Sequence, residues 1–427
     1  MEFTLFIVVF VILFALGLPV GFTMIVSSLV YGLAIGMDLS YFILESFGSF
    51  NTIALVAIPM FVLTSEVMNE SSVSDKLFNF SNSLVGWIPG GLAHTNVINS
   101  IIFAGMSGSA LADVGGIGLV EYKAMKDRGF DPPFAAAVTC ASSVIGPIIP
   151  PSIPVIIYAM VIPAASVGAL FLGGVIPGLI MGLFMMIYIF FIAKKRKYPI
   201  ERRLKRNEFW PAIRAGILPV LTPAILLLTI TLGMVTVSEG AVITVVYTLI
   251  IGTFIYRKFG IKKFWLSLKS VAMVLGPMLI FLMASKMFSF VLAKEHLADT
   301  LSVTLLNITK TPFIIMLIVN VFFLVMGCLS DPIVNIILFA PLAWSVASPL
   351  GFDPTAFGIV VILNTMIGII TPPIGGIVFA MSGLTKVPIQ KIFKEVTPFI
   401  IAYIIILVLL SAFPSIITFI PNLAMGR

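Results

Sequence analysis

The segment GFDPPFAAAVTCASSVIGPIIPPSIPVIIYAM spans residues 129–160, and a second segment, GFDPTAFGIVVILNTMIGIITPPIGGIVFAM, spans residues 351–381. Both open on Gly-Phe-Asp-Pro and both carry a glycine followed by a Pro-Pro pair, and these shared positions recur 222 residues later. AGMSGSALAD at 104–113 and MGCLSD at 326–331 match at the same offset. The repeated pattern predicts an internal duplication, joined near KKRKYPIERRLKR at 194–206.

The composition places most of the chain in lipid. Of the 427 residues, 60% are hydrophobic and only 10% are charged, whereas a soluble domain carries about 25% charge. This excludes a water-soluble enzyme. Because the apolar runs are long and do not alternate with polar residues, helices are favoured over a barrel. We therefore expect an all-α polytopic membrane protein.

Each repeated segment contains a point where a helix must break. GPIIPPS at 146–152 and GIITPP at 368–373 hold paired prolines, which remove amide donors and strain the preceding turn. Irregular backbone at membrane depth is tolerated only where it is buried in protein or lines a polar cavity. Interrupted helices in corresponding places of two repeats are typical of a transporter binding site.

The basic loops predict the orientation. Residues 119–132, 194–206 and 257–269 are rich in Lys and Arg, whereas 36–50 and 342–355 contain neither. Basic loops face the cytoplasm. Because 119–132 and its repeat counterpart differ in charge, the two halves are expected to be inverted. About ten full spans and two re-entrant hairpins satisfy every loop and place both termini outside the cytoplasm.

The expected spans cover residues 3–22, 23–37, 50–69, 133–163 (broken), 171–193, 216–235, 238–256, 271–293, 356–381 (broken) and 397–420, with hairpins over 84–118 and 312–345.

The hairpin tips carry matching polar side chains. The first tip holds Ser107, Ser109 and Asp113, and the second holds Ser330 and Asp331. Hydroxyls, carbonyls and one carboxylate suit a monovalent cation such as sodium better than calcium, which prefers more carboxylates. The alternative for the two aspartates is helix N-capping, and for the serines it is packing or hydrogen bonding to the helix backbone.

Other polar residues near the breaks are candidates for substrate contact, and interhelical hydrogen bonding is the alternative for all of them. They are Asn96, Asn99, Thr139, Ser142, Ser143, Asn364 and Thr365. Glu66 and Lys286 occupy nearly equivalent places in the two halves, where we expect a structural ion pair or a contact with another subunit.

Enzymatic functions are disfavoured. The two histidines and two cysteines form no recognisable metal or nucleophile motif, and no G-x-x-x-x-G-K-[ST] loop for ATP is present. We expect neither catalysis nor a cofactor other than coupling ions.

The quoted motifs resemble the large membrane subunit of TRAP transporters, the tripartite ATP-independent periplasmic systems, over essentially the whole chain. The most specific parts are the SGS tip with Asp113, GPIIPPS, the two GFDP loops, GCLSDP and GIITPP. VTVSEGAVITVVY departs from the family's T-P-T-E-A-A-A stretch but keeps Glu239.

The resemblance implies an elevator-type secondary transporter of the bacterial inner membrane, driven by sodium. It implies two partners, a small four-helix membrane subunit and a periplasmic binding protein, and an organic acid as substrate, such as a sialic acid, a C4-dicarboxylate or a sugar acid. The sodium sites carried over from the family comprise Ser107, Gly108, Ser109, Asp113, Gly146, Pro150 and Ser152 for one ion and Gly327, Ser330, Asp331, Gly368, Thr371 and Pro372 for another.

The implied division is a scaffold over 1–83 and 215–300, a transport part over 84–193 and 301–427, and a basic cytoplasmic linker over 194–214. The nearest rival is a stand-alone sodium-dicarboxylate carrier without a binding protein, since inverted repeats and two hairpins would look the same.

Overall fold

The computed structural model describes residues 1–426 other than 49, 72 and 204, and it describes their side chains except at 41, 45, 74, 75, 104–107, 298, 299 and 308. Every regular element in this part of the chain is a helix, which confirms the all-α prediction.

The helices of the first half are α1 (Glu2–Ala15), α2 (Val20–Ala34), α3 (Leu39–Gly48), α4 (Ala54–Glu70), α5 (Val73–Val85), α6 (Gly91–Ser107), α7 (Ala110–Asp113), η1 (Val114–Gly118), α8 (Leu119–Asp127), α9 (Pro132–Ser143), α10 (Ile153–Val161) and α11 (Val167–Arg196). Those of the second half are α12 (Arg206–Thr231), α13 (Val237–Ile250), η2 (Ile251–Ile255), α14 (Ile261–Lys294), α15 (Leu297–Ile308), α16 (Pro312–Leu329), α17 (Pro332–Ala347), η3 (Ser348–Leu350), α18 (Pro354–Gly368), α19 (Gly376–Thr385), α20 (Ile389–Ala412) and α21 (Ser415–Met425).

The order of helices repeats along the chain. A helical hairpin, a helix broken in two and a long helix follow one another as α6 to α11 and again as α16 to α20. α9 begins at Pro132 and α18 at Pro354, and α11 begins at Val167 and α20 at Ile389, so both pairs lie 222 positions apart. The helix order thus agrees with the duplication predicted from the motifs.

The N-terminal helices are shorter than predicted. The sequence predicted one helix through residues 3–22, but α1 ends at Ala15, because Gly17 adopts a φ of +83° and Pro19 follows it. With 14 and 15 residues, α1 and α2 are each about 22 Å long, less than the roughly 30 Å of a hydrocarbon core.

Within the described residues, seven helices are long and apolar enough to cross a membrane by themselves: Val167–Arg196, Arg206–Thr231, Val237–Ile255, Ile261–Lys294, Pro312–Leu329, Pro332–Leu350 and Ile389–Ala412. The chain is therefore a multi-pass membrane protein, and the figure of about ten full spans stays a prediction.

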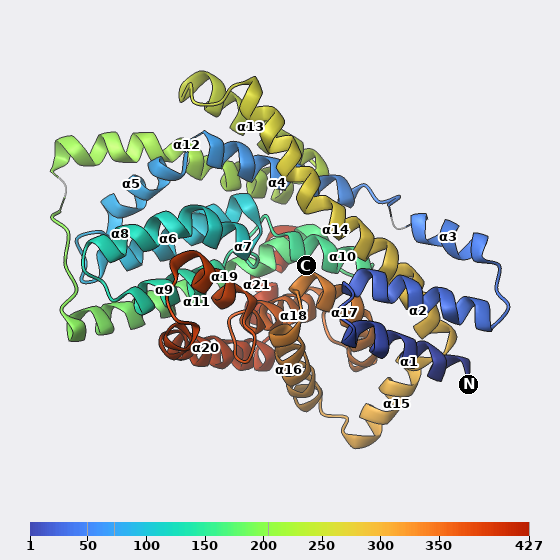
Figure 1. Ribbon diagram of the computed structural model, residues 1–427. Coiled ribbons are helices and arrows are strands. Elements are labelled where there is room, and N and C mark those ends of the chain that lie inside the picture. The colour runs from blue at the N-terminus through green and yellow to red at the C-terminus, as the bar shows by residue number, and fades with distance from the viewer. Residues whose placement is uncertain (49, 72, 204, 427) are drawn as a thin grey trace.

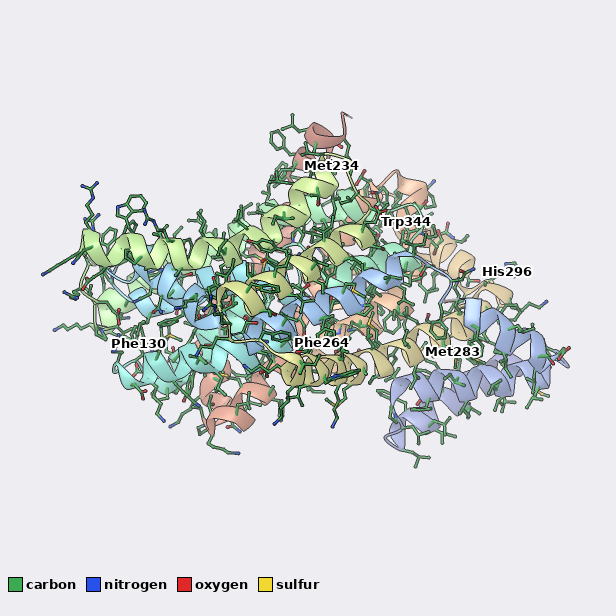
Figure 2. All side chains as sticks on the ribbon, turned by 90° about the horizontal axis from the view of Figure 1, so that it is seen from above. Phe130, Met234, Phe264, Met283, His296 and Trp344 are labelled. Carbon is green, nitrogen blue, oxygen red and sulfur yellow. The ribbon has the colours of Figure 1, made fainter. Side chains whose placement is uncertain are left out.

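The broken helices form the centre of the core. All residues of α18 from Thr355 to Gly368 are buried, as are those of α9 from Phe134 to Ser143. Helices that are covered all round must lie inside the molecule. Figure 1 shows α1 and α2 at one end of an elongated molecule and α5, α8 and α12 at the other. Figure 2 labels Phe264 and Met283 on α14, which runs along one side of the molecule.

Candidate functional site

A cavity of about 440 Å³ lies where the two hairpin tips and the two helix breaks meet. The first hairpin contributes residues 108–112 and the second contributes 327–333. Residues within each break and directly after it also line the cavity, including Pro147 and Ile153 at the first break and Ile369 and Gly376 at the second. The opposite wall comes from α4 and α14, which lie within the ranges that the resemblance implied for the scaffold. Segments more than 200 positions apart in sequence thus share one cavity.

The first hairpin tip packs directly onto the first break. Gly108 turns the chain with a φ of +58°, and a Cβ on it would lie 2.9 Å from the Pro151 carbonyl oxygen. Ser109 follows as the N-cap of α7, and its hydroxyl accepts the Ala112 amide at 3.4 Å. Of the predicted ligands of this tip, Gly108 therefore lies next to the 146–152 segment and Ser109 follows it directly, while the Ser107 side chain lies outside the described residues.

The predicted interruption at 146–152 is confirmed, because α9 ends at Ser143 and α10 begins at Ile153. Gly146 and Pro150 lie within the interruption, which contains a cis peptide bond between Pro150 and Pro151. Ser152 closes the interruption as the N-cap of α10: its Oγ accepts the Val155 amide at 3.2 Å and donates to the Pro147 carbonyl.

The second tip and break meet through two glycines. The break at 368–373 is confirmed, since α18 ends at Gly368 and α19 begins at Gly376, with a cis bond between Pro372 and Pro373. A Cβ on Gly368 would lie 2.5 Å from the Gly327 Cα, so the two backbones are in direct contact. The Thr371 hydroxyl donates to the Ile367 carbonyl at 2.7 Å.

The two predicted aspartates behave differently. Asp331 is the N-cap of α17, and its Oδ1 accepts the Ile333 amide at 2.8 Å, as the capping alternative predicted; it also lines the cavity. Ser330 beside it hydrogen bonds to Asn335. Asp113 lies behind the cavity, 1% exposed, where its Oδ2 accepts the Ser100 hydroxyl at 2.8 Å and its Oδ1 has no partner among the described residues.

Four predicted substrate residues of the first half form a buried network with Glu121, a residue the sequence did not single out: Asn96, Asn99, Thr139 and Ser142. Asn96 and Asn99 each donate a side-chain amide to the Glu121 carboxylate, and all three are fully buried. Ser142 donates to the Asn96 oxygen at 2.7 Å, and Thr139 lies 3.4 Å from the Asn96 amide. The two asparagines lie three residues apart in sequence, which puts both on one helix face. This spacing is the sequence feature that indicates a shared hydrogen-bond acceptor.

The remaining candidates also bond between or along helices. Asn364 donates to the Asn320 oxygen at 2.8 Å, and Asn320 donates in turn to Ser411 of α20. The hydroxyls of Thr365 and Ser143 donate to backbone carbonyls of their own helices. None of the seven candidates lines the cavity. They bond as the packing alternative predicted, and their contact with substrate stays a prediction.

Glu66 of α4 lines the cavity instead of forming the ion pair predicted with Lys286. Its Oε1 accepts the Ser270 hydroxyl of α14 at 2.8 Å, and Lys286 is exposed. The structural ion pair is therefore wrong, because the two helices present these side chains to different surroundings, and contact with another subunit stays a prediction. A carboxylate from the α4 and α14 wall thus faces the tips of both hairpins.

The donors around the cavity suit a monovalent cation. Within the described part of the chain, no three His, Cys, Asp or Glu side chains come together, as a site for a transition-metal ion would require. Hydroxyls, interrupted backbone and single carboxylates are what the tips and breaks offer, which is a donor set for a weakly held hard cation.

Comparisons with known proteins identify the family that this chain resembles in sequence. A family model described as "Tripartite ATP-independent periplasmic transporter, DctM component" matches residues 7–416. The sialic acid TRAP transporter large permease protein SiaM of Vibrio cholerae is 36% identical over 416 residues, covering 97% of both chains. The C4-dicarboxylate large permease DctM of Pseudomonas aeruginosa is 32% identical and covers 86% of both.

A solved structure shares the fold. The YdaH transporter of Alcanivorax borkumensis superposes with a TM-score of 0.61 over 91% of this chain and 88% of its own, at 14% identity. At 14% sequence identity, this similarity shows a shared fold and nothing about function.

Proposed function

The chain belongs to the DctM family of large permease subunits of tripartite ATP-independent periplasmic transporters, and from this we propose that it performs sodium-coupled uptake of an organic acid across the bacterial inner membrane. It is a transporter subunit, since its named relatives are permeases and not enzymes. The observation that carries the proposal is the single cavity shared by both hairpin tips and both helix breaks.

Sodium would be held at two places beside this cavity. One site combines the first tip, including Ser109, with the 146–152 break, which Gly108 approaches closely. The other combines Ser330, Asp331 and the backbone around Gly327 with the 368–373 break. Each pairs a tip with a break, so that ion binding would fasten a hairpin to a broken helix.

Transport would proceed by an elevator motion. The cavity lies between the α4 and α14 wall, which we assign to the scaffold, and the hairpins and broken helices, which we assign to the moving part. Its wall is therefore divided between the two parts, as alternating access by sliding one part past the other requires.

The membrane potential would contribute to accumulation. If two sodium ions enter with a monoanion, one net positive charge moves inward and gains about 2.3 kcal/mol per 100 mV, which corresponds to about fiftyfold accumulation. No cofactor other than the coupling ions enters this scheme.

Substrate would be delivered by a periplasmic binding protein, with a small membrane subunit as the second partner. A stand-alone carrier of the same architecture is the competing function. Uptake into proteoliposomes, with and without a candidate periplasmic binding protein, separates the two. We expect uptake only with the binding protein; uptake of free substrate at full rate without it would favour the stand-alone carrier.

The sodium sites are tested in the same assay. Asp331→Ala and Ser107→Ala should raise the sodium concentration for half-maximal uptake, whereas Asp38→Ala, at an exposed position outside the cavity, should leave it unchanged. Unchanged sodium dependence in both site variants would contradict the assignment.

A further inference from the structure

The charges around the cavity have one sign. Glu66 and Asp331 line it, and no Lys, Arg or His is among its described lining residues. The four side chains of the first tip that lie outside the described set belong to Ala104, Gly105, Met106 and Ser107, which carry no ionisable group. No basic side chain is therefore available to pair with an anionic substrate at this wall.

The rest of the lining is mainly apolar. Val62 and Met278 stand on the α4 and α14 wall, and Ile333, Met366 and Ile377 on the other side. An apolar wall accommodates the neutral part of a solute, and a second carboxylate placed against it would lose its water without gaining a partner. The lining thus disfavours a solute that is charged at both ends.

Glu66 is held at this wall by a specific contact. Ser270 of α14 donates to its Oε1 at 2.8 Å, which fixes the carboxylate between the two wall helices. Asp331 has an amide partner of its own at the start of α17 and belongs to a proposed sodium site. Glu66 is therefore the lining carboxylate that neither caps a helix nor belongs to a proposed ion site.

We infer that the cavity is selective for monocarboxylates with a neutral body over dicarboxylates, and that Glu66 sets this selectivity. This rests on the proposed function, because sodium bound at the tips must offset the acidic wall before any anion enters. Since Coulomb energy is proportional to the product of the charges, the Glu66 carboxylate repels a dianion twice as strongly as a monoanion. The order of binding is then sodium first and anion second.

The test measures the potential inside the cavity with reagents of one chemistry and different charge. Ile374 lines the cavity and is 44% exposed, so the Ile374→Cys thiol is a reporter within it. Bromoacetamide, bromoacetate and 2-bromosuccinate are neutral, singly and doubly charged, and in each case the thiolate displaces bromide to form a thioether. The full chain is labelled in its complex with the small subunit, and rates are read by mass spectrometry of the peptide that carries the reporter, since native Cys328 also lines the cavity. Each is divided by the rate with free 2-mercaptoethanol, a thiol without another charged group.

Without sodium, bromoacetate should react about tenfold more slowly than bromoacetamide at this reporter, a difference of about 1.4 kcal/mol, and 2-bromosuccinate more slowly still. The Ser348→Cys thiol, on an exposed segment outside the cavity, should not discriminate. Equal relative rates for the three reagents at both thiols would overturn the inference.

Glu66→Gln should increase the relative rate at which bromoacetate alkylates the reporter thiol by about threefold. The rate with 2-bromosuccinate should increase about tenfold, because the logarithm of the rate change is proportional to the charge of the reagent. Glu66→Asp, which keeps the charge, and Glu70→Gln, which removes a partly exposed carboxylate paired with Lys263, should change neither. If Glu66→Gln has no effect, or if Glu66→Asp matches it, charge selectivity does not come from Glu66.

Sodium should raise the relative rate of bromoacetate when it replaces potassium at equal ionic strength. If sodium has no effect while Glu66→Gln does, the sodium requirement fails together with the proposed coupling, and the charge selectivity of the wall remains. The two failures are thus distinguishable.

Discussion

Gly368→Ala should damage the second predicted sodium site through backbone contact alone. The added Cβ would lie 2.5 Å from both Cα and the carbonyl carbon of Gly327 and 3.0 Å from the Cys328 nitrogen. Carbon atoms in contact normally stand about 3.5–4.0 Å apart, so the end of α16 and the end of α18 must separate by about 1 Å. No flexible side chain is available to move away. Overpacking of this kind costs about 1–3 kcal/mol.

The consequence should appear in two measurements. Heating the detergent-solubilised protein and following the monodisperse fraction by size exclusion should show a lower midpoint. At a temperature where the variant stays folded, the sodium concentration for half-maximal uptake should rise, because the backbone around Gly327 is displaced from the 368–373 break.

Two further glycines calibrate the effect. A Cβ on Gly327 would meet the Gly368 Cα at 3.1 Å, a milder contact, so Gly327→Ala should cost less. Gly383, within α19, has nothing within 4 Å of its Cβ position, and Gly383→Ala should stabilise the helix by about 0.5–1 kcal/mol. If Gly368→Ala is tolerated as well as Gly383→Ala, the close crossing of the two backbones is refuted.

Three other outcomes follow from the structure. Glu121→Ala leaves the side-chain amides of Asn96 and Asn99 without their acceptor in the core and should lower the free energy of unfolding by about 3 kcal/mol or more. Glu70→Ala, at a partly exposed ion pair, should lower it by less than about 1 kcal/mol; similar thermal midpoints for the two variants would contradict the network. Tyr198→Phe removes a 2.6 Å hydrogen bond to Asp131 and should cost about 1 kcal/mol. Burial and this bond raise the pKa of Tyr198 to about 12, so the phenol stays protonated and the bond is lost only as pH rises through that value; a cost that already disappears near the ordinary tyrosine pKa of about 10 would show the assignment to be mistaken. Finally, a membrane-impermeant thiol reagent should label Ser348→Cys in intact cells and Lys126→Cys only after permeabilisation; the same accessibility for both would rule out the predicted orientation.

Local physics explains why the helix breaks could be predicted. Paired prolines cannot supply amide donors, and they disfavour a helical conformation in the residue before them, whatever surrounds them. The interruptions after Ser143 and Gly368 accordingly lie where the motifs predicted them. The N-terminal helices show the limit of this reasoning. The long apolar run predicted one helix over residues 3–22, although Gly17 and Pro19 within it are residues that end helices, and α1 ends just before them.

By itself, the sequence determined the helical membrane class, the duplication, the interrupted segments and the family, because each depends on composition or on short motifs that can be compared without knowing the packing. Only the tertiary structure decided the partners of the polar side chains. Asn96 and Asn99 bond to Glu121, and Glu66 lines the cavity instead of pairing with Lys286. The physical reason is that a buried polar group bonds to whichever partner the packing of distant helices brings within reach, and that packing has no local signature in the chain.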